Sequence, residues 1–344
     1  MTRSTWSGGV TWSGTGKWMP DGLTASGPLV PEAAIDGTLI SGLQAASWRL
    51  GITDFLAELS PGSCSLSFAG DVDVLPGDSI VLSIPTGTLW VGRVDSVNNM
   101  RDTAGHQWTT VNGSDSLGAL ATAYVVDADP LALNLEQWAE ALATAAGVSL
   151  DLVDDSVSGL PTTILASAPV SGSVLDLINS NARRSNAMIA LQRDGAIHAV
   201  IREAVTPADQ VVITDRYSER TKVTSQAANI NRWTITADAI EYGADDADIA
   251  LYGQRTYEAG SDVWLAATSQ FDDWVAYGGS QRPIRAYTLP MKSWADDDLM
   301  LLDPFDWVTA DGTDQQIMGL AHNVTASPPL WTVTLDVDNL LDLL

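Results

Sequence analysis

Two stretches of the chain, far apart in sequence, share the same order of short motifs. The first runs from Leu75 to Val111 and the second from Leu302 to Asp338. Each contains Pro-x-Asp-x-Val/Ile, then a strand-like segment with a glycine near its centre, then a segment that opens on Trp-Thr. Pro and Gly favour turns, and alternating polar and apolar residues favour half-buried strands. We therefore predict one β-module that occurs twice, and this duplication is the strongest constraint on the fold.

Residues 46–126 have the pattern of a first antiparallel β-barrel. Polar and apolar residues alternate over Ser63–Phe68 and over Ile80–Ile84, and the turn residues Pro76–Asp78 stand between them. Gly92 lies inside the next strand, which indicates a bulge or a close backbone approach. Short strands separated by frequent turns are typical of barrels and sandwiches.

Residues 127–210 form a middle region in which the hydrophobic period becomes helical. The apolar residues of Leu135–Ala146 fall on one helical face, Asn134 can cap the start of this helix, and Gly147 can end it. Ser173–Asp176 resembles a capping box, so we predict that a second helix starts there.

A β-hairpin closes this middle region. Met188–Arg193 and Ala196–Ile201 are β-prone runs, and they flank Asp194-Gly195. A two-residue Asp-Gly link between such runs predicts a hairpin with a type I′ turn.

Residues 211–344 are predicted to form a second β-barrel with a short helical insertion. Val211–Ile213, Trp233–Ile235 and Asp248–Tyr252 have the character of strands, residues 265–277 that of a short helix, and the second copy of the module follows. The expected fold class is mainly β with an α/β insert (α+β). It consists of two antiparallel tube-like β-barrels plus a middle helix-and-hairpin region.

Residues 1–45 form a Gly/Ser/Trp-rich N-terminal arm in which tryptophans recur every six residues. Because that spacing is even, an extended arm would present these rings on one side, where a neighbouring subunit could bury them. A flexible tail with exposed aromatics is the alternative. Further tryptophans lie in the two modules, at positions that we interpret as equivalent or nearly so. The interface candidates are Trp6, Trp12, Trp18, Trp90, Trp108, Trp307 and Trp331.

The chain is strongly acidic. Its 43 acidic and 17 basic residues give a formal net charge of −26. Such a surface repels phosphate backbones, so stable nucleic-acid binding is not expected. Two interpretations remain open: simple colloidal solubility, or a lumen through which DNA passes without adhering.

No catalytic, cofactor or metal site is predicted. The single Cys64 excludes an internal disulfide and favours folding in a reducing cytosol. His106, His198 and His322 fall in different predicted elements and have no metal-pair spacing. The acidic clusters do not match a calcium loop, and the usual hydrolase, zinc and phosphate-binding motifs are absent. No apolar run approaches the roughly 18 residues of a membrane span, and the N-terminus lacks the apolar core of a signal peptide.

At this point the motifs resemble those of phage tail hub proteins over roughly residues 46–340. The matching segments are Ser65–Phe68, Pro76–Ile80, Leu89–Val97, Val111–Leu117, Ser173–Ile178, Arg193–Gly195 and Leu302–Asp338. The first four resemble the family's first barrel, the next two its middle region, and the last its second barrel.

The resemblance implies a non-enzymatic virion protein at the distal tail tip, assembled in the host cytoplasm. Hubs of this type are homotrimers in which each chain contributes two tube-like barrels. Six similar barrels would then adapt the six-fold tail tube and distal tail ring to a three-fold tip, and would line the DNA passage. The implied partners are the distal tail protein ring, the tape-measure protein and other minor tail or receptor-binding proteins. The alternatives are a distal tail ring protein or, in a different class, a Trp-rich carbohydrate-binding or glycan-cleaving tail protein.

Overall fold

The computed structural model describes most of the chain between residues 29 and 338. The described residues are 29–52, 58–128, 134–156, 159–160, 170–184, 187–201, 210–224, 232–235, 240–244, 246–252, 254, 256–259 and 283–338.

Thirteen strands of the described residues pair in one large sheet. They are β1 (Glu32–Ile35), β2 (Thr38–Ile40), β3 (Leu43–Gly51), β4 (Ser63–Ala69), β5 (Ser79–Ile84), β6 (Gly87–Arg101), β7 (Gln107–Ser114), β13 (Val211–Val212), β14 (Glu219–Thr224), β18 (Pro283–Met291), β19 (Trp307–Ala310), β20 (Thr313–Ala326) and β21 (Pro329–Asp338).

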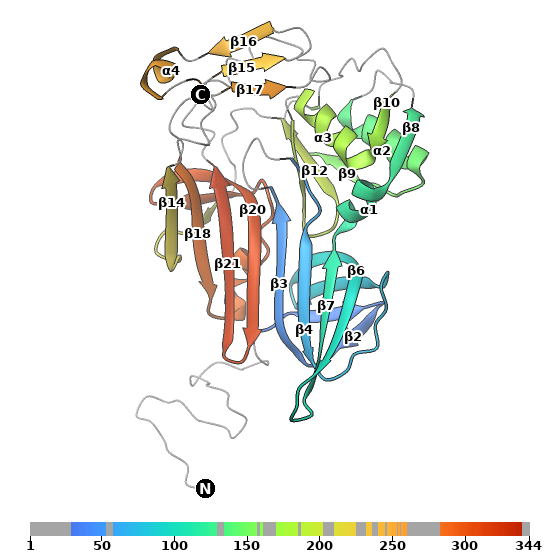
Figure 1. The fold of residues 1–344 in the computed structure, drawn as a ribbon. Coiled ribbons are helices and arrows are strands. Elements are labelled where there is room, and N and C mark those ends of the chain that lie inside the picture. Colours follow the sequence, from blue (N-terminus) through green and yellow to red (C-terminus); the bar gives the residue numbers. More distant parts are fainter. Residues whose placement is uncertain are drawn as a thin grey trace.

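The order of strands across the sheet is β14-β18-β21-β20-β3-β4-β7-β6-β5-β1-β2, with β19 beside β20 and β13 beside β19 (Figure 1). The predicted mainly β fold class is confirmed. Among the described residues, however, the strands do not form two closed barrels. They form two halves of one continuous sheet, because β3 of the first half pairs with β20 of the second.

The predicted duplication is present in the strand pairing. The order β3-β4-β7-β6-β5 in the first module corresponds to β14-β18-β21-β20-β19 in the second. The long strand of each module carries a register shift at the same place, between Val94 and Ser96 in β6 and between Ile317 and Gly319 in β20. A bulge fixes the register of a strand pair, so these two bulges define which residues correspond.

The turn before each module's central strands is repeated in detail. In Leu75–Asp78 the carboxylate of the last residue accepts a 2.8 Å hydrogen bond from the backbone N–H of the first, and Asp303–Asp306 repeats this bond at 2.8 Å. The third residue has a positive φ in both turns, at 99° for Gly77 and 78° for Phe305. The Pro-x-Asp motif is therefore a structural repeat.

The sequence alignment of the repeat was wrong beyond this turn. By the bulges and pairing registers, Gly319 corresponds to Ser96, and Trp331 corresponds to Gln107 in place of Trp108. The reason is the length of the hairpin before the bulge: Ser79 pairs with Arg93 in β5–β6, whereas their counterparts Trp307 and Gln316 close a shorter hairpin in β19–β20. Motif matching lost the register there.

The β3–β20 pair joins the two modules through a buried aromatic cluster. The rings of Trp48 and His322 stack with their centroids 4.5 Å apart and their planes 9° from parallel. Trp331 Nε1 donates a hydrogen bond of 3.3 Å to His322 Nδ1. Burial lowers the pKa of His322 to about 3, so this imidazole is neutral. His322 is thus a structural residue of the junction.

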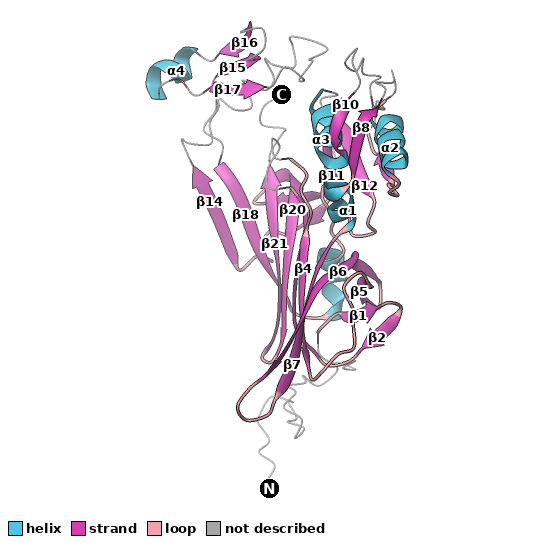
Figure 2. Ribbon diagram, turned by 45° about the vertical axis from the view of Figure 1, so that its right-hand side comes forward, coloured by secondary structure: helices cyan, strands magenta, loops and turns pink. Residues whose placement is uncertain are grey.

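The middle region packs beside one end of the first module (Figure 2). Its elements are α1 (Ser116–Thr122), β8 (Tyr124–Ala128), α2 (Leu135–Ala146), β9 (Leu152–Asp154), β10 (Val170–Ser173), α3 (Val174–Arg184), β11 (Ala187–Leu191) and β12 (Ile197–Ile201). The predicted limits of α2 are confirmed: Asn134 caps its start by accepting from the Gln137 N–H, and Gly147 ends it at φ 73°. Ser173 likewise accepts from the Asp176 N–H at the start of α3.

The predicted hairpin is confirmed as the β11–β12 pair, but the type I′ turn is wrong. The Gln192 N–H donates to the Ala196 carbonyl, so the link holds three residues. Only its last residue, Gly195, has a positive φ, at 90°. Type I′ needs a positive φ at two successive residues, whereas a three-residue link needs it at one.

The tip of this hairpin contacts the second module. Arg193 donates from its backbone N–H to Asp303 Oδ1 at 2.9 Å, and its Nε lies 2.7 Å from Asp303 Oδ2. Gln192 Nε2 donates to the Pro304 carbonyl at 3.2 Å. Burial raises the pKa of Asp303 to about 6, against the opposing effect of Arg193. The hairpin thus connects the middle region to the Pro-x-Asp turn of the second module.

Other elements lie outside the large sheet. The strands β15 (Arg232–Ile235), β16 (Ile240–Ala244) and β17 (Thr256–Ala259) form a separate three-stranded sheet, and η2 (Trp294–Asp296) and α6 (Asp297–Met300) precede β19.

Two further sequence expectations are corrected. Asp248–Tyr252 was predicted as a strand but belongs to the helix α4 (Asp246–Tyr252), because acidic residues in the first turn and Ala and Leu favour a helix there. β1, β2 and the start of β3 lie within the predicted arm 1–45, so ordered β structure begins earlier than expected. The helix predicted over residues 265–277 falls outside the described residues.

We expect Gly319→Ala to destabilise the junction between the modules. A Cβ at this position would lie 2.4 Å from the Ile52 carbonyl oxygen, which is backbone and cannot move away cheaply. The free energy of unfolding should fall by about 1–3 kcal/mol in denaturant titration. The control is Gly87→Ala. The nearest atom to a Cβ at this position is at the end of the flexible Leu301 side chain, 3.2 Å away, and it can move aside. Equal stability of the two variants would contradict the tight junction.

We expect Arg193→Ala to destabilise the protein by about 2 kcal/mol at pH 8, because it leaves the buried Asp303 carboxylate without its cation. An acid whose folded pKa is raised binds its proton more readily in the folded state, so this penalty grows as the pH rises from about 4 through the raised pKa. The loss should therefore be smaller at pH 5 than at pH 8 in thermal or denaturant unfolding. Arg93→Ala, at an exposed position of β6, is the control. A loss independent of pH would contradict the role of the ion pair.

Candidate functional surface

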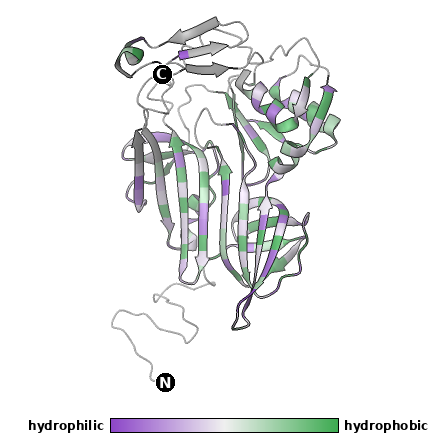
Figure 3. Ribbon diagram, viewed as in Figure 1, coloured by the Kyte–Doolittle hydropathy of each residue, from purple (hydrophilic) through white to green (hydrophobic). Residues whose placement is uncertain are grey.

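One side of the large sheet carries short polar side chains from both modules. In β4 and β7, and in β20 from Leu320 to Val324, every second residue is buried against the core. The residues between them lie on the opposite side of the strands, and hydrophobic and hydrophilic residues alternate along parts of the sheet (Figure 3). We call this side the polar face. It comprises Ala45, Ser47, Arg49, Ser65, Ser67, Arg93, Ser96, Asn98, Met100, Trp108, Thr110, Asn112, Ser114, Glu219, Thr221, Thr288, Ala321, Asn323, Thr332, Thr334 and Asp336.

Neighbouring strands are linked across the polar face by side-chain hydrogen bonds. Ser65 Oγ donates to Asn112 Oδ1 at 3.0 Å, and Asn112 Nδ2 donates to Ser96 Oγ at 3.3 Å. The hydroxyl groups of Thr288 and Thr334 lie 3.5 Å apart in the second module. These contacts tie β4, β7 and β6 together, and β18 to β21. They hold these side chains against the sheet.

The polar face is close to electrically neutral although the whole chain is strongly acidic. Its charged members are Arg49, Arg93, Glu219 and Asp336, two of each sign. Arg49 and Asp336 pair with each other at 2.5 Å across the junction of the modules. Burial raises the pKa of Asp336, and the neighbouring Arg49 lowers it. The excess negative charge of the chain therefore lies elsewhere, and this face presents neither a basic patch nor an acidic one.

The tryptophans of the modules do not occupy equivalent places, in contrast to the sequence interpretation. Trp90 and Trp331 have no exposed surface, so they belong to the core of a single chain and cannot contact a partner or a sugar in this structure. Trp108 and Trp307 are half-buried and remain interface candidates. Trp6, Trp12 and Trp18 fall outside the described residues. The tryptophan content, which suggested a carbohydrate-binding module, is thus accounted for in part by core packing.

The remaining reactive groups form local structural contacts. In the β6–β7 link, His106 Nδ1 lies 2.8 Å from Asp102 Oδ2. In β12 of the hairpin, His198 Nδ1 lies 2.5 Å from Asp155 Oδ2. Cys64 is buried, and burial raises the pKa of its thiol. In the described parts of the chain, no group of three or more His, Cys, Asp or Glu side chains could hold a metal ion. Within the same residues, no helix is long and apolar enough to cross a membrane.

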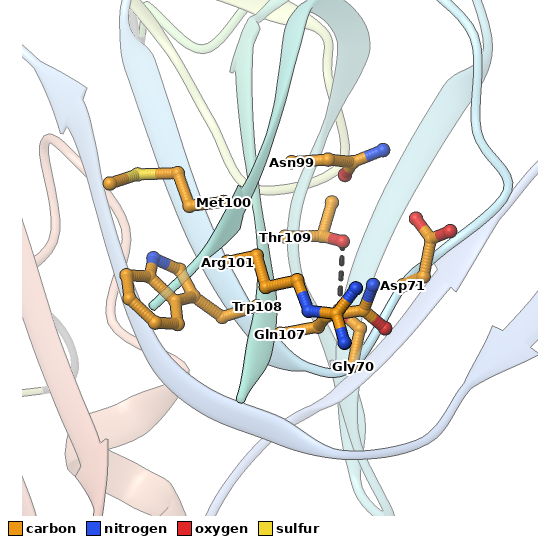
Figure 4. A pocket seen from close by; sticks show the side chains of 8 residues that line it. All are labelled: Gly70, Asp71, Asn99, Met100, Arg101, Gln107, Trp108 and Thr109. Carbon is orange, nitrogen blue, oxygen red and sulfur yellow. Dashed lines mark hydrogen bonds between the residues drawn. The ribbon is translucent and has the colours of Figure 1, made fainter. Parts of the chain in front are cut away.

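A small pocket of about 90 Å³ lies at the edge of the first module (Figure 4). Asn99 and Arg101 of β6 line it, together with Asp71 after β4 and Thr109 of β7. Thr109 Oγ1 donates to the Gly70 carbonyl at 2.9 Å and closes one side. By the bulge equivalence Asn99 corresponds to His322, the residue on which Trp48 stacks in the second module. The pocket therefore lies where the first module lacks a neighbouring strand.

No protein-family model matches this sequence, and no curated protein is significantly similar to it. Solved structures with the same fold do exist. The 43 kDa tail protein of prophage MuSo2 from Shewanella oneidensis superposes with a TM-score of 0.65 at 12% identity, covering 91% of this chain and 98% of its own. A tail protein from Neisseria meningitidis MC58 gives a TM-score of 0.69 at 13% identity, covering 90% and 96%.

A third similar structure is the c3393 protein of E. coli, a component of the type VI secretion system that exhibits structural similarity to the T4 bacteriophage tail proteins gp27 and gp5. It gives a TM-score of 0.53 at 10% identity and covers 89% of this chain and 76% of its own. These comparisons show that the chain has the fold of phage tail proteins. The resemblance inferred from its motifs is thereby confirmed at the level of the fold.

Proposed function

We propose that this chain is a non-enzymatic structural subunit of a phage tail, and that it acts as the hub at the distal tail tip. The observation that carries the proposal is the duplicated module, whose two copies lie in one sheet and share the polar face. The fold of the phage tail proteins with which it superposes supports the same function.

The duplication supports a homotrimer. Three copies, each with two equivalent modules, would place six modules around one axis, and such a ring can meet a six-fold ring on one side and a three-fold structure on the other. The proposed partners are the distal tail ring, the tape-measure protein and other minor tail or receptor-binding proteins.

The two ends of the sheet differ in a way that suits this adaptor. At one end lie the β6–β7 and β20–β21 hairpins, one from each module (Figure 1). At the other end the modules differ: Asp303 is bound by the β11–β12 hairpin, whereas its counterpart Leu75 is 65% exposed. One end therefore repeats six times around a trimer, and the other repeats three times.

The polar face is proposed to line the DNA passage. Sequence composition suggested that acidic charge would prevent adhesion, but the polar face is nearly neutral. Its short hydroxyl and amide groups provide no cluster of cations for phosphates. Of its two arginines, Arg49 is paired with Asp336 and Arg93 lies in another strand, β6. Because phosphate contacts with Lys and Arg supply most non-specific DNA affinity, a face without a cluster of cations lets DNA pass without binding.

Mass measurement over a range of concentrations tests the trimer. We expect a discrete species of three chains, either alone or when the distal tail ring protein is added. Since the two modules make one chain equivalent to two ring positions, a six-chain ring would instead favour the distal tail ring assignment. A chain that stays monomeric in both conditions, with its fold intact, would contradict the proposed hub.

Adding cations to the polar face tests the proposed DNA passage. The double variant Ser65→Lys with Asn112→Lys should acquire salt-dependent binding to short DNA duplexes, whereas the parent protein should bind none, as fluorescence anisotropy can measure. The control carries two lysines on exposed positions of α2, Gln137→Lys with Glu140→Lys. Equal DNA binding by both variants would count against passage along this face. The absence of DNA binding by both assembled variants would also count against it.

A further inference from the structure

Among the unpaired strand edges of the described sheet are two, one in each module, whose counterparts in the other module are paired. β6 pairs with β5 only as far as Arg93, so its segment Val97–Arg101 has β7 on one side and no described strand on the other. β14 pairs with β18 and lies at the end of the sheet. Unpaired edges of this length expose a row of backbone N–H and C=O groups, which makes them templates for a further strand.

The internal repeat shows what belongs at these edges. The counterpart of β6 is β20, and the counterpart of β14 is β3. β20 and β3 pair with each other from Gly319 to Thr325 to form the junction between the modules. The β3–β20 junction is therefore a template in which both corresponding edges are filled, whereas β6 of the first module and β14 of the second lack such a partner.

Burial agrees with this comparison. In β20, next to β3, the residues Leu320, His322 and Val324 are all buried. Their counterparts in β6 are Val97, Asn99 and Arg101, of which the last two are exposed. The pocket at Asn99 marks the same vacancy, because Trp48 stacks on the corresponding His322.

We infer that β6 of one copy pairs antiparallel with β14 of a second copy, which repeats the β3–β20 junction between chains. Transfer of the β3–β20 register gives the pairs Val97–Thr224, Asn98–Val223, Asn99–Lys222, Met100–Thr221 and Arg101–Arg220. The contact is head-to-tail, since it joins different edges of the two chains, and such a contact closes into a ring when the rotation allows. Closure after three copies rests on the proposed function, whereas the strand pairing does not.

The inferred contact carries charge where the internal junction is apolar. Arg101 and Arg220 stand at the register positions held by Val324 and Ala46 in the internal junction. Arg220 already pairs with Asp311 in its own chain, and Asp71 lines the same pocket as Arg101. Charged edges suppress the uncontrolled stacking of free chains. We therefore expect a contact weaker than the β3–β20 junction and dependent on ionic strength.

A pair of engineered cysteines tests the register. The Ile52 N–H donates to the Met318 carbonyl, which fixes the hydrogen-bonding alternation and makes the transferred Met100–Thr221 pair a non-hydrogen-bonded one. Cα atoms in such pairs lie about 4.5 Å apart, within disulfide range. Both residues are exposed and on the polar face, so Met100→Cys with Thr221→Cys should form an intermolecular disulfide on mild oxidation.

Two controls make this experiment specific. Met100→Cys with Arg220→Cys places the second thiol on the opposite side of β14 and should cross-link far less. The single-cysteine variants Met100→Cys and Thr221→Cys retain the buried Cys64 and should form no series of covalent oligomers. The readout is non-reducing electrophoresis, in which the in-register pair is expected to yield covalent dimers and trimers and no larger species.

A backbone variant gives an independent measurement. By the same alternation, the N–H of Asn99 points to the free edge, so Asn99→Pro removes an edge donor and leaves the β7 ladder intact. Mass measurement should show loss of assembly with an unchanged melting profile, whereas Asn99→Val keeps the donor and should assemble.

The outcomes separate the two proposals. Trimers in which the in-register cysteine pair cross-links no better than the control pair would overturn the strand pairing and leave the trimeric hub standing. A folded chain that stays monomeric and forms no cross-link at any concentration, both alone and with the distal tail ring protein, would overturn both. If Asn99→Pro fails to fold, the cysteine pairs still decide.

Discussion

The pairing of β3 with β20 is the interaction on which the rest of the structure depends. It joins strands from opposite ends of the chain and makes one sheet from two modules. The ring of Trp48 stacks on His322, and Trp331 donates to the same imidazole. Burial keeps that imidazole neutral, so it can accept this bond without the cost of a buried charge. Because the sheet is continuous across this pair, both modules present one shared polar face.

The two modules joined at this pair are alike in some features and different in others. They share the Pro-x-Asp turn, the bulge of the long strand and the order of strands, which are the features that build one face and one set of hairpins. They differ at their edges and in their contact with the middle region, where only the second module binds Arg193. A subunit with two similar modules along its sheet and one middle region at one end is compatible with the proposed adaptor between six-fold and three-fold rings.

Much of this fold could be predicted from local sequence signals. Alternation gave β4 and β5, the caps Asn134 and Gly147 gave α2, and the repeat of Pro-x-Asp gave the duplication. The β3–β20 pairing could not be predicted, because it depends on contacts between distant segments that leave no periodic signal. The correspondence of Gly319 with Ser96 was missed for the same reason: the register is fixed by a bulge. Net charge likewise gave no information on its distribution, so the neutral polar face emerged only with the pairing.

Electron cryomicroscopy of the assembled protein, alone or at the tail tip, tests most directly the claim that the two modules act as equivalent units around one axis. The map should contain three chains whose six modules are related by approximate six-fold symmetry at the hairpin end, with Ser65, Asn112 and Thr334 facing the channel. The middle regions should then follow three-fold symmetry only. A map in which the polar face points outward, or in which the two modules of a chain lie at different radii, would contradict this claim.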